Sequence, residues 1–394
     1  MLMETLNIGN HGLNSSAKRY RCRAKIGKCV ALILISIFVM SCKSTLLTNS
    51  TTVNVTDPNA DESAKHLMLR IREIPKSGYA FGHQDATAYG MGWKNDGTRY
   101  KSDVAEVSGD FPAVYGFEIG HIELGHRQNL DSVDFNLMTR LIQKAHKSGG
   151  IISISWHPDN PVTNKSAWDP SPAVAEILEG GLMHPKYQAW VAKVADFMHG
   201  LKTQTGKPIP IVFRPFHEMN GSWFWWGRKS CTPKEFQLLW RQTYELLTNT
   251  YNVHNLLYCY STDVVKNEKE YLKFYPGDDY VDILGIDLYH KNSTERYIEL
   301  LKDNLSLLSK IGKFKNKPFA MTEGGLNMVP VEDWWTNVLD KSVANTGIAW
   351  ALFWRNAWPN HYFGPFKGQK SSADFKKFKG LSHVLFLEDV KKIR

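Results

Sequence analysis

The sequence predicts an α/β protein built as a single (β/α)8 TIM barrel. Eight short apolar segments recur along the chain, and amphipathic segments with helical periodicity separate them. Most of the apolar segments end in polar or aromatic side chains, as expected at the carboxyl ends of barrel strands, where active sites assemble. After residue 60, no long Gly/Ser-rich or Pro-rich linker and no internal repeat interrupts this pattern, which favours one large domain.

The eight predicted strands alternate with the predicted helices in chain order. A doubly wound open sheet is the competing fold, but it calls for a Gly-rich phosphate turn after its first strand, and Gly82-His-Gln-Asp85 is not one. The predicted strands are Tyr79–His83, Ala113–Ile119, Ile151–His157, Ile209–Glu218, Leu256–Thr262, Ile283–Tyr289, Phe319–Glu323 and Ile348–Arg355. The predicted helices include Val133–His146, Tyr187–Lys202, Pro233–Thr248, Thr294–Ile311 and Val331–Ala344.

The N-terminal residues are typical of an export signal. A basic region precedes the apolar run Val30–Met40, which has the length of a signal-peptide core. The following Val39-Met-Ser-Cys42 resembles a bacterial lipobox, whose cysteine becomes the lipidated first residue. An ordinary cleaved signal with an incidental cysteine is the alternative. We therefore expect a lipoprotein signal peptide over 1–42, a flexible tether over 43–64 and the barrel over 65–394.

The net charge of the chain and its cysteines restrict which molecules and metal ions it is expected to bind. The whole chain has a formal net charge of +9, and the six basic and one acidic side chains of residues 1–42 leave about +4 for the remainder. That charge is too small and too dispersed to indicate nucleic-acid binding. We expect a monomer that meets the membrane through its lipid anchor only, on the periplasmic side because no acidic cluster follows Cys42. Cys231 and Cys259 could pair or stay free, and they match no zinc-binding pattern.

The segment from Ile211 to Gly227 contains the largest group of candidate functional residues. Glu218 follows His217 where the hydrophobic run stops, and three tryptophans come next: Trp223, Trp225 and Trp226. A carboxyl walled by aromatic rings suits an acid that stays protonated near neutral pH, and flat indole faces suit sugar rings. The alternative is a buried carboxyl that pairs with Arg214 under tryptophans of the core.

Glu323, at the end of the seventh predicted strand, is expected to face Glu218, at the end of the fourth. Two carboxyls with a sugar between them hydrolyse glycosides: one donates a proton to the departing oxygen, and the other attacks the anomeric carbon or activates water. Strand alternation gives Arg214 the same face as Glu218, where a guanidinium would favour the ionised form of Glu323. The alternative for Glu323 is an acid at the start of a helix.

With these residues in place, the chain resembles glycoside hydrolase family 26, whose best-known members are β-mannanases. The resemblance runs from about residue 65 to the C-terminus. It depends on Arg214-Pro-Phe-His-Glu-Met-Asn-Gly-Ser-Trp223, Trp156-His-Pro158, Asp287-Leu-Tyr289, Thr322-Glu-Gly324 and Trp354-Arg355. In most of the barrel clan to which the family belongs, an asparagine precedes the acid. Here His217 does, as in family 26.

The resemblance implies that Glu218 is the acid/base and Glu323 the nucleophile of a retaining reaction through a covalent glycosyl-enzyme. Inversion, which needs a wider gap between the carboxyls, is the alternative for the pair. The implied substrate is a β-mannan polysaccharide or a manno-oligosaccharide, with no cofactor and no metal. The residues expected to bind the sugar or support the site are His157, His217, Trp223, Asp287, Tyr289, Trp354, Arg355, Arg214, Glu118 and Trp168.

Individual positions have more specific expectations. Trp223 would stack on the sugar beyond the cleaved bond, and Tyr289 would contact the nucleophile. Trp354 and Arg355 would grip the far side of the cleft. Trp168 could be another platform, whereas Trp225 and Trp226 are as compatible with the core as with the site.

Three other functions compete with a β-mannanase. A metal-dependent hydrolase would use the histidines at predicted strand ends, His83, His157, His217 and His290, but they lack the His-x-His or His-Glu-x-x-His spacing. A non-catalytic glycan-binding lipoprotein would keep the tryptophans without needing both Glu218 and Glu323. A family 26 enzyme could also cut mixed-linkage β-glucan or β-1,3-xylan. Cleavage within chains or from an end depends on loops 158–187 and 356–372, and it stays open.

Overall fold

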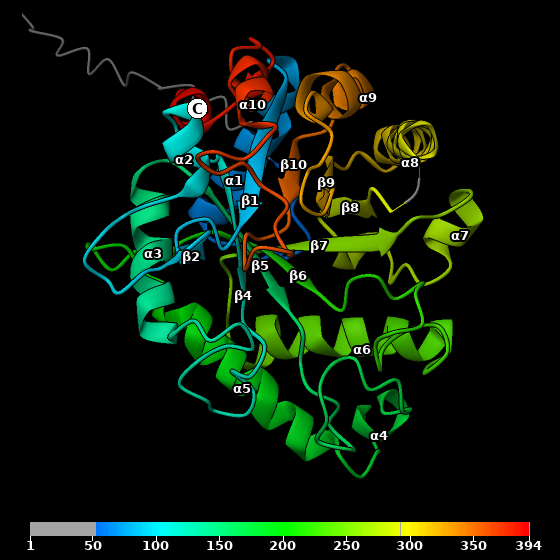
Figure 1. Cartoon of the computed structure of the whole chain (residues 1–394). Coiled ribbons are helices and arrows are strands. Elements are labelled where there is room, and N and C mark those ends of the chain that lie inside the picture. Colours follow the sequence, from blue (N-terminus) through cyan, green and yellow to red (C-terminus); the bar gives the residue numbers. More distant parts are fainter. Residues whose placement is uncertain (1–52, 292, 394) are drawn as a thin grey trace, which may run out of the picture. The chain divides into compact units, whose positions relative to one another are not determined.

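Eight parallel strands form a closed barrel in the computed structural model, which describes residues 53–291 and 293–393. Pairing of the last barrel strand with the first closes the ring (Figure 1). The strands are β1 (Tyr79–Gln84), β4 (Val114–Glu118), β5 (Ile151–Trp156), β6 (Ile211–Pro215), β7 (Leu256–Asp263), β8 (Ile283–Tyr289), β9 (Phe319–Gly325) and β10 (Trp350–Phe353). The predicted (β/α)8 fold is confirmed, with all eight strands in the predicted order.

Helices surround these strands, as Figure 1 shows. They are α1 (Glu62–Glu73), α2 (Asp103–Ser108), α3 (Phe135–Lys147), α4 (Val174–Ile177), α5 (His184–Gly200), α6 (Pro233–Glu245), α7 (Glu268–Leu272), α8 (Thr294–Lys315), α9 (Lys341–Val343), α10 (Ser372–Lys379) and α11 (Leu387–Val390). The helix predicted over 331–344 is a π-helical segment, Trp334–Asp340, that continues into α9. The other predicted helices correspond to α3, α5, α6 and α8.

Side-chain caps fix the start of several helices that follow barrel strands. Thr232 and Glu235 form a reciprocal capping box at α6, and the Asp134 carboxylate accepts hydrogen bonds from two backbone N–H groups at the start of α3. Such caps satisfy N–H groups that have no partner within the helix. The loops between strand ends and helix starts are therefore held at both ends, and these loops carry most of the candidate site.

Alternation along the strands separates two apolar cores. In β7, Leu257 and Cys259 belong to the cluster that fills the barrel, whereas Leu256, Tyr258 and Tyr260 belong to the cluster between the strands and the helices. Four residues of α1 join the interior cluster: Ala64, Leu67, Met68 and Ile71. Because the interior residues they accompany lie near the strand beginnings, α1 closes the N-terminal end of the barrel and leaves the C-terminal end as the mouth.

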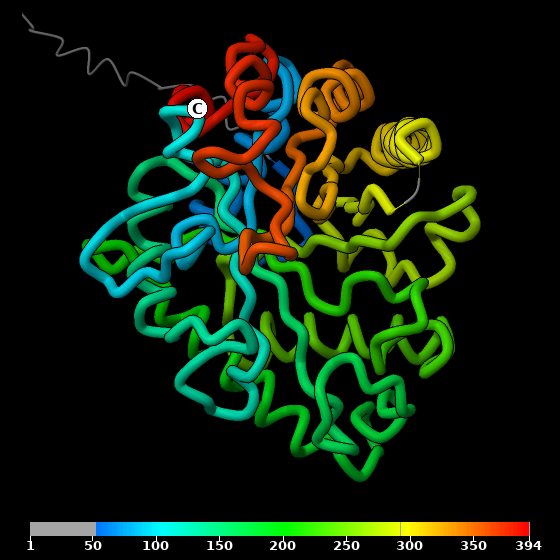
Figure 2. Tube along the Cα trace, in the orientation of Figure 1, coloured from blue at the N-terminus to red at the C-terminus, as the bar shows by residue number. Residues whose placement is uncertain are grey.

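The C-terminal part of the chain lies beside the first barrel strand. The short strand β11 (Val384–Leu385) pairs in parallel with Tyr79 and Ala80 at the beginning of β1. Figure 2 shows the corresponding blue and red parts of the chain together. A further two-stranded hairpin, β2 (Tyr89–Gly90) with β3 (Trp93–Lys94), lies in the loop after β1.

Residues before the predicted boundary at residue 65 already contact the barrel. Thr56 donates two hydrogen bonds to the Asp282 carboxylate, at 2.7 and 2.9 Å, and the Asp57 carboxylate lies 2.8 Å from the His254 ring. Residues 53–64 are therefore bound to the barrel and are not a tether. The predicted signal peptide, Cys42 and the start of the tether lie outside the described residues.

Two further observations concern membranes and disulfides. Within the described part of the chain, no helix combines the length and apolarity that a bilayer crossing requires. Cys231 and Cys259 are both buried and both free, so they do not form the disulfide that the sequence left open.

Candidate active site

A left-handed turn presents Glu218 at the mouth. Strand β6 ends at Pro215, three residues before the predicted end, and Phe216 and Glu218 then adopt positive φ angles of 49° and 54°. Such angles are unfavourable for side chains other than glycine, asparagine and aspartate, so the surrounding structure must hold them. The Glu218 N–H donates to the Ser261 carbonyl on β7, at 3.0 Å. The prediction that strand alternation places Glu218 is therefore wrong, because the turn places it.

The surroundings of Glu218 favour its protonated form. Burial raises the pKa of Glu218 well above its usual value, and the nearby negative charges of Asp287, Glu323 and Asp263 raise it further, while Arg214 opposes them. One donor reaches the carboxyl directly, since the Trp223 indole N–H lies 2.8 Å from its Oε2. A partly buried carboxyl of this kind can hold a proton at neutral pH and release it to a substrate.

Glu323, by contrast, is surrounded by donors. It lies on β9, where its Oε2 accepts a hydrogen bond from Arg214 Nη2 at 2.5 Å and its Oε1 accepts one from the Tyr289 hydroxyl at 2.7 Å. The His217 ring lies 4.0 Å from Oε2. A guanidinium and a hydroxyl on opposite oxygens stabilise a carboxylate and fix its orientation.

Arg214 joins Glu323 to a second carboxylate. Its Nη1 donates to Asp287 Oδ2 at 2.8 Å, and the Thr322 hydroxyl donates to the other Asp287 oxygen at 2.7 Å. Although burial lowers the pKa of Arg214, the charges of Asp287 and Glu323 outweigh it and raise that pKa above its usual value. Arg214 is thus a fixed cation between two buried carboxylates, with Asp287 holding it in place.

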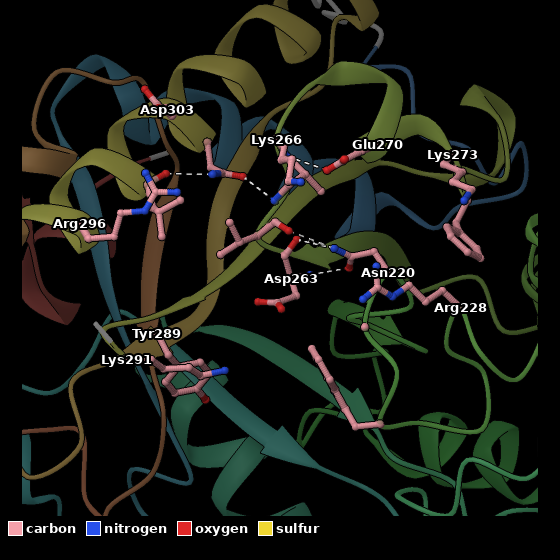
Figure 3. A pocket seen from close by; sticks show the side chains of 17 residues that line it. Asn220, Arg228, Asp263, Lys266, Glu270, Lys273, Tyr289, Lys291, Arg296 and Asp303 are labelled. Atoms are coloured by element: carbon pink, nitrogen blue, oxygen red, sulfur yellow. Dashed lines mark hydrogen bonds between the residues drawn. The ribbon is translucent and has the colours of Figure 1, made fainter. Parts of the chain in front are cut away.

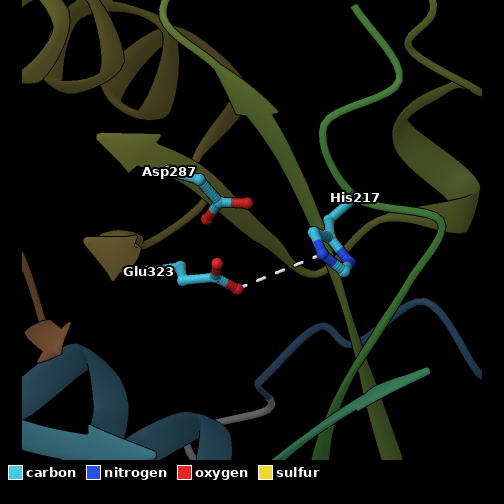
Figure 4. Close-up of side chains that lie close together, drawn as sticks. All are labelled: His217, Asp287 and Glu323. Carbon is cyan, nitrogen blue, oxygen red and sulfur yellow. Dashed lines mark ion pairs between the residues drawn. The ribbon is translucent and has the colours of Figure 1, made fainter. Parts of the chain in front are cut away.

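His217, Asp287 and Glu323 also form the one group, among residues 53–291 and 293–393, whose ligand atoms lie as close together as in a metal site, within 4.8 Å (Figure 4). The Arg214 guanidinium already donates to both carboxylates of this group. A divalent cation placed among them would meet that positive charge. Arg214 is therefore the cation that holds Asp287 and Glu323 together in this group.

Two histidine rings lie against each other beside the carboxylates. The rings of His157 and His217 meet edge to face, with centroids 4.4 Å apart. Burial, reinforced by the charges of Arg214 and His157, lowers the pKa of His217 well below its usual value, so this ring is neutral at neutral pH. Burial also opposes the charged form of His157, but Glu118 outweighs it and raises the pKa of His157.

Glu118 fixes the position of the His157 ring through a direct contact. Its Oε2 lies 2.7 Å from His157 Nδ1 and accepts a hydrogen bond from the Ser155 hydroxyl, while its Oε1 accepts two backbone N–H groups. The Glu118 side chain has no exposed surface. The prediction that Glu118 binds substrate is therefore corrected: it positions the His157 ring and is shielded from the cleft.

The four tryptophans near the turn divide into two pairs. Trp225 and Trp226 are fully buried, and their N–H groups donate to the carbonyls of Pro158 and His217. They belong to the core and hold the turn that carries Glu218. Trp223 is partly buried and bonded to Glu218, whereas Trp168 is 49% exposed and stacks on His157 with ring centroids 5.2 Å apart.

Trp354 and Arg355 follow β10 on the other side of Glu323. The Trp354 N–H donates to the Gly324 carbonyl at 3.0 Å, which fixes Trp354 next to the strand that carries Glu323. Arg355 Nη1 lies 2.5 Å from an Asp131 oxygen and donates to the Tyr89 hydroxyl at 3.1 Å. Neither Asp131 nor Tyr89 is among the predicted site residues, because Asp131 lies in the loop after β4 and Tyr89 in the short strand β2, away from the ends of the predicted barrel strands.

A cavity of about 690 Å³ opens beside the Glu218 turn (Figure 3). Trp223 and Tyr289 are among its lining residues, and each is bonded to one of the two carboxyl groups. The rest of its lining comes from the segment after the Glu218 turn, from the loops after β7 and β8, and from α7 and the first half of α8. The cavity therefore continues the site on the Trp223 side.

Comparison with known proteins gives a consistent result. The profile of glycosyl hydrolase family 26 matches residues 56–339. The chain is 30% identical over 355 residues to a mannan endo-1,4-β-mannosidase of Bifidobacterium adolescentis, an alignment that covers 84% of this chain and 35% of that protein. It is 31% identical over 328 residues to a mannan endo-1,4-β-mannosidase of Bacillus subtilis, with 76% of this chain and 80% of that protein covered.

Among solved structures, a GH26 β-mannanase from Bacteroides ovatus superposes with a TM-score of 0.81 and 40% sequence identity. The match covers 84% of this chain and 98% of that chain. The chain thus spans about a third of the length of the Bifidobacterium relative, but most of the length of the Bacillus and Bacteroides proteins.

Proposed function

The chain belongs to glycosyl hydrolase family 26, and from this premise we propose that it hydrolyses β-1,4-mannosidic linkages in mannan, galactomannan or glucomannan. The observation that carries the proposal is the opposite surroundings of two carboxyl groups at one mouth. Glu218 is desolvated among negative charges, and Glu323 is held by Arg214 and Tyr289. Glycoside hydrolysis needs this division between a proton donor and an ionised partner.

In the first step, Glu218 donates its proton to the glycosidic oxygen while a Glu323 oxygen attacks the anomeric carbon. The bond between that carbon and the glycosidic oxygen breaks, the leaving sugar departs as an alcohol, and a glycosyl ester forms on Glu323. Glu218 is now a carboxylate. Tyr289 and Arg214 hold the nucleophile in one orientation, which reduces the freedom it must lose to reach the transition state.

In the second step, water enters on the side that the leaving sugar has vacated. Glu218 accepts a proton from this water, and the resulting hydroxide oxygen attacks the anomeric carbon. The ester bond to Glu323 breaks, which returns both carboxyl groups to their starting states. Two displacements at the same carbon retain the β configuration.

The aromatic residues and histidines are assigned to sugar binding. Trp223, next to the acid, would stack on the leaving sugar, and Trp354 with Arg355 would bind the sugars on the opposite side. His157 and His217 lie between Trp168 and the carboxyl pair, where His217 is neutral and suited to contact a sugar hydroxyl. Asp287 and Glu118 act through Arg214 and His157 and touch no substrate.

A time course with reduced mannohexaose tests the proposal. Proton NMR of the first product should detect the β-anomer before mutarotation, and Glu323→Ala should abolish turnover while it leaves oligosaccharide binding intact. An α-anomer as first product would replace retention by inversion. Equal inactivity of the wild type and the variant on mannan, lichenan and xylan would reject the enzyme in favour of a glycan-binding protein, and cleavage of only lichenan or xylan would reassign the substrate.

The N-terminal sequence supports a second, separate proposal: Cys42 is lipidated, and the anchor holds a monomeric enzyme in the bacterial envelope on the periplasmic side. Fractionation of cells that express the whole chain or its Cys42→Ser variant tests this. The wild type should partition with membranes and resist protease added to intact cells, whereas the variant should be released. Equal partitioning of both would contradict lipidation, and digestion in intact cells would indicate the cell surface.

A further inference from the structure

The cavity beside Trp223 has a charge that a neutral polysaccharide does not require. Five cationic side chains line it: Arg228, Lys266, Lys273, Lys291 and Arg296. Three carboxylate side chains also line it, Asp263, Glu270 and Asp303, which leaves a formal charge of +2. Mannan carries no charge, and sugars are usually bound by aromatic faces and polar side chains. The surplus of cations therefore calls for a specific explanation.

Most of these cations have no ion-pair partner within the described residues. Arg296 pairs with Glu299 at 2.6 Å, but no carboxylate oxygen of the described chain lies within 4.0 Å of the charged groups of Arg228, Lys266, Lys273 or Lys291. The Lys291 ammonium instead lies 6.0 Å from the Trp223 ring centroid and 5.6 Å from that of Tyr289. A neutral sugar placed here would displace water from these charges without compensating them.

Two of the cations act on the space next to the catalytic pair. Burial raises the pKa of Asp263, and the charges of Lys291 and Arg228 partly counteract that rise, as expected for groups that face the same space. Trp223 and Tyr289 connect this space to Glu218 and Glu323. Under the proposed mechanism, the side of Glu218 and Trp223 receives the leaving group.

We propose that this cavity is a leaving-group subsite for glycan chains that carry a carboxylate, such as a uronic acid substituent or an acidic sugar at the reducing end. Lys291 lies beside the rings of Trp223 and Tyr289, which are bonded to the carboxyl pair, and Arg228 and the other cations line the same cavity. The inference depends on the proposed function, because that function identifies the leaving-group side. Neutral mannan remains a substrate, and the carboxylate adds affinity.

A matched pair of substrates tests the charge alone. Mannohexaose oxidised at its reducing end carries one carboxylate on the leaving-group side, and mannohexaose reduced to the alditol is its neutral, equally ring-opened control. We expect kcat/KM for the aldonate to exceed that for the alditol by about two- to fivefold at low salt, the size of a solvent-accessible ion pair. Because salt screens such pairs, the ratio should fall toward one between roughly 0.01 M and 0.5 M NaCl.

Single substitutions test whether Lys291 and Arg228 cause the preference for the aldonate. Lys291→Met and Arg228→Met should each lower the ratio of aldonate to alditol kcat/KM, and the double variant should bring it close to one. Lys147→Met, which removes an exposed lysine at the end of α3, should leave the ratio at the wild-type value. Using a ratio cancels any general loss of activity or folded protein in a variant.

The outcomes separate the two proposals. If the alditol is cleaved and the aldonate is no better a substrate, the acidic subsite is rejected and the mannanase stands. A preference that persists in the double variant or at high salt also rejects the assignment to these cations. If neither substrate is cleaved while the protein is folded, the proposed function itself fails.

Discussion

Glu218 and Glu323 are the same side chain at one mouth, but the chain surrounds them in opposite ways. Glu218 sits on a left-handed turn, its charge is disfavoured by burial and by three acids, and one indole N–H reaches it. Glu323 sits on strand β9, just after a register shift against β8, and a guanidinium and a phenol occupy its two oxygens. The role of each carboxyl is therefore set by its neighbours and by the local backbone.

The largest expected effect comes from removing the carboxylate of Glu323. Glu323→Ala should lower kcat on mannan by roughly 10⁴- to 10⁶-fold, since losing a covalent nucleophile removes the whole reaction path. Steady-state kinetics with a reducing-sugar assay measures the loss, and calorimetric titration with mannohexaose checks that binding persists. A loss of less than about tenfold would remove the distinction between the two carboxyls, because Glu323 would then not be the attacking group.

Removing the acid should have a smaller effect that depends on the substrate. Glu218→Ala should lower kcat/KM on mannan by roughly 10²- to 10⁴-fold, the usual contribution of general acid catalysis. An aryl mannobioside with a dinitrophenolate leaving group needs no proton, so its first step should be nearly unchanged, and a burst of phenolate should precede slow turnover. If both substrates lose activity equally, Glu218 is not the proton donor.

Arg214 is the main difference between the two environments, and its loss should reduce stability. Arg214→Met leaves two buried carboxylates without their cation, which should lower the free energy of unfolding by about 3–5 kcal/mol in urea denaturation. Arg127→Met is the matched control: it breaks the exposed pair with Asp134, and such pairs contribute about 1 kcal/mol or less. Equal effects of the two variants would show that the buried pairing is not what holds Glu323.

The smallest expected effect concerns the indole that touches Glu218. The Trp223 N–H stabilises the ionised carboxyl, so Trp223→Phe should raise the pKa of Glu218 further. Activity needs the protonated acid and is lost as pH rises through its pKa, so the basic limb of kcat/KM should move to higher pH by about 0.5–1 unit. Trp168→Phe, at an indole with no contact to either carboxyl, should leave that limb in place. A shift to lower pH in Trp223→Phe would contradict the assignment.

The sequence predicted the barrel because apolar segments and strand-end polar residues are both local signals. It also predicted that Arg214 would lie beside Glu323, which the 2.5 Å contact confirms. It could not predict the turn at Phe216 and Glu218, since positive φ angles in these residue types depend on the surrounding tertiary structure. The sequence also could not predict which tryptophans are buried. Trp225 and Trp226 are more buried than Trp223, and this difference depends on loops that are far apart in the sequence.

Asp131 and Glu118 show what a prediction based on residues at strand ends leaves out. Asp131 pairs with Arg355 from a loop after β4, with no local signal of that contact. Glu118 does end a strand, but its side chain is buried under His157 and does not face the cleft.

The position of α1 has a practical consequence. Thr56 and Asp57 bind the barrel at residues just before β8 and β7, and α1 covers the same end. The chain thus enters the barrel at the end opposite the mouth. Coupling the protein to a bead or surface through residue 53 should leave the cleft facing outward, where it can engage a polymer too large to diffuse, and such a preparation could be recovered and reused.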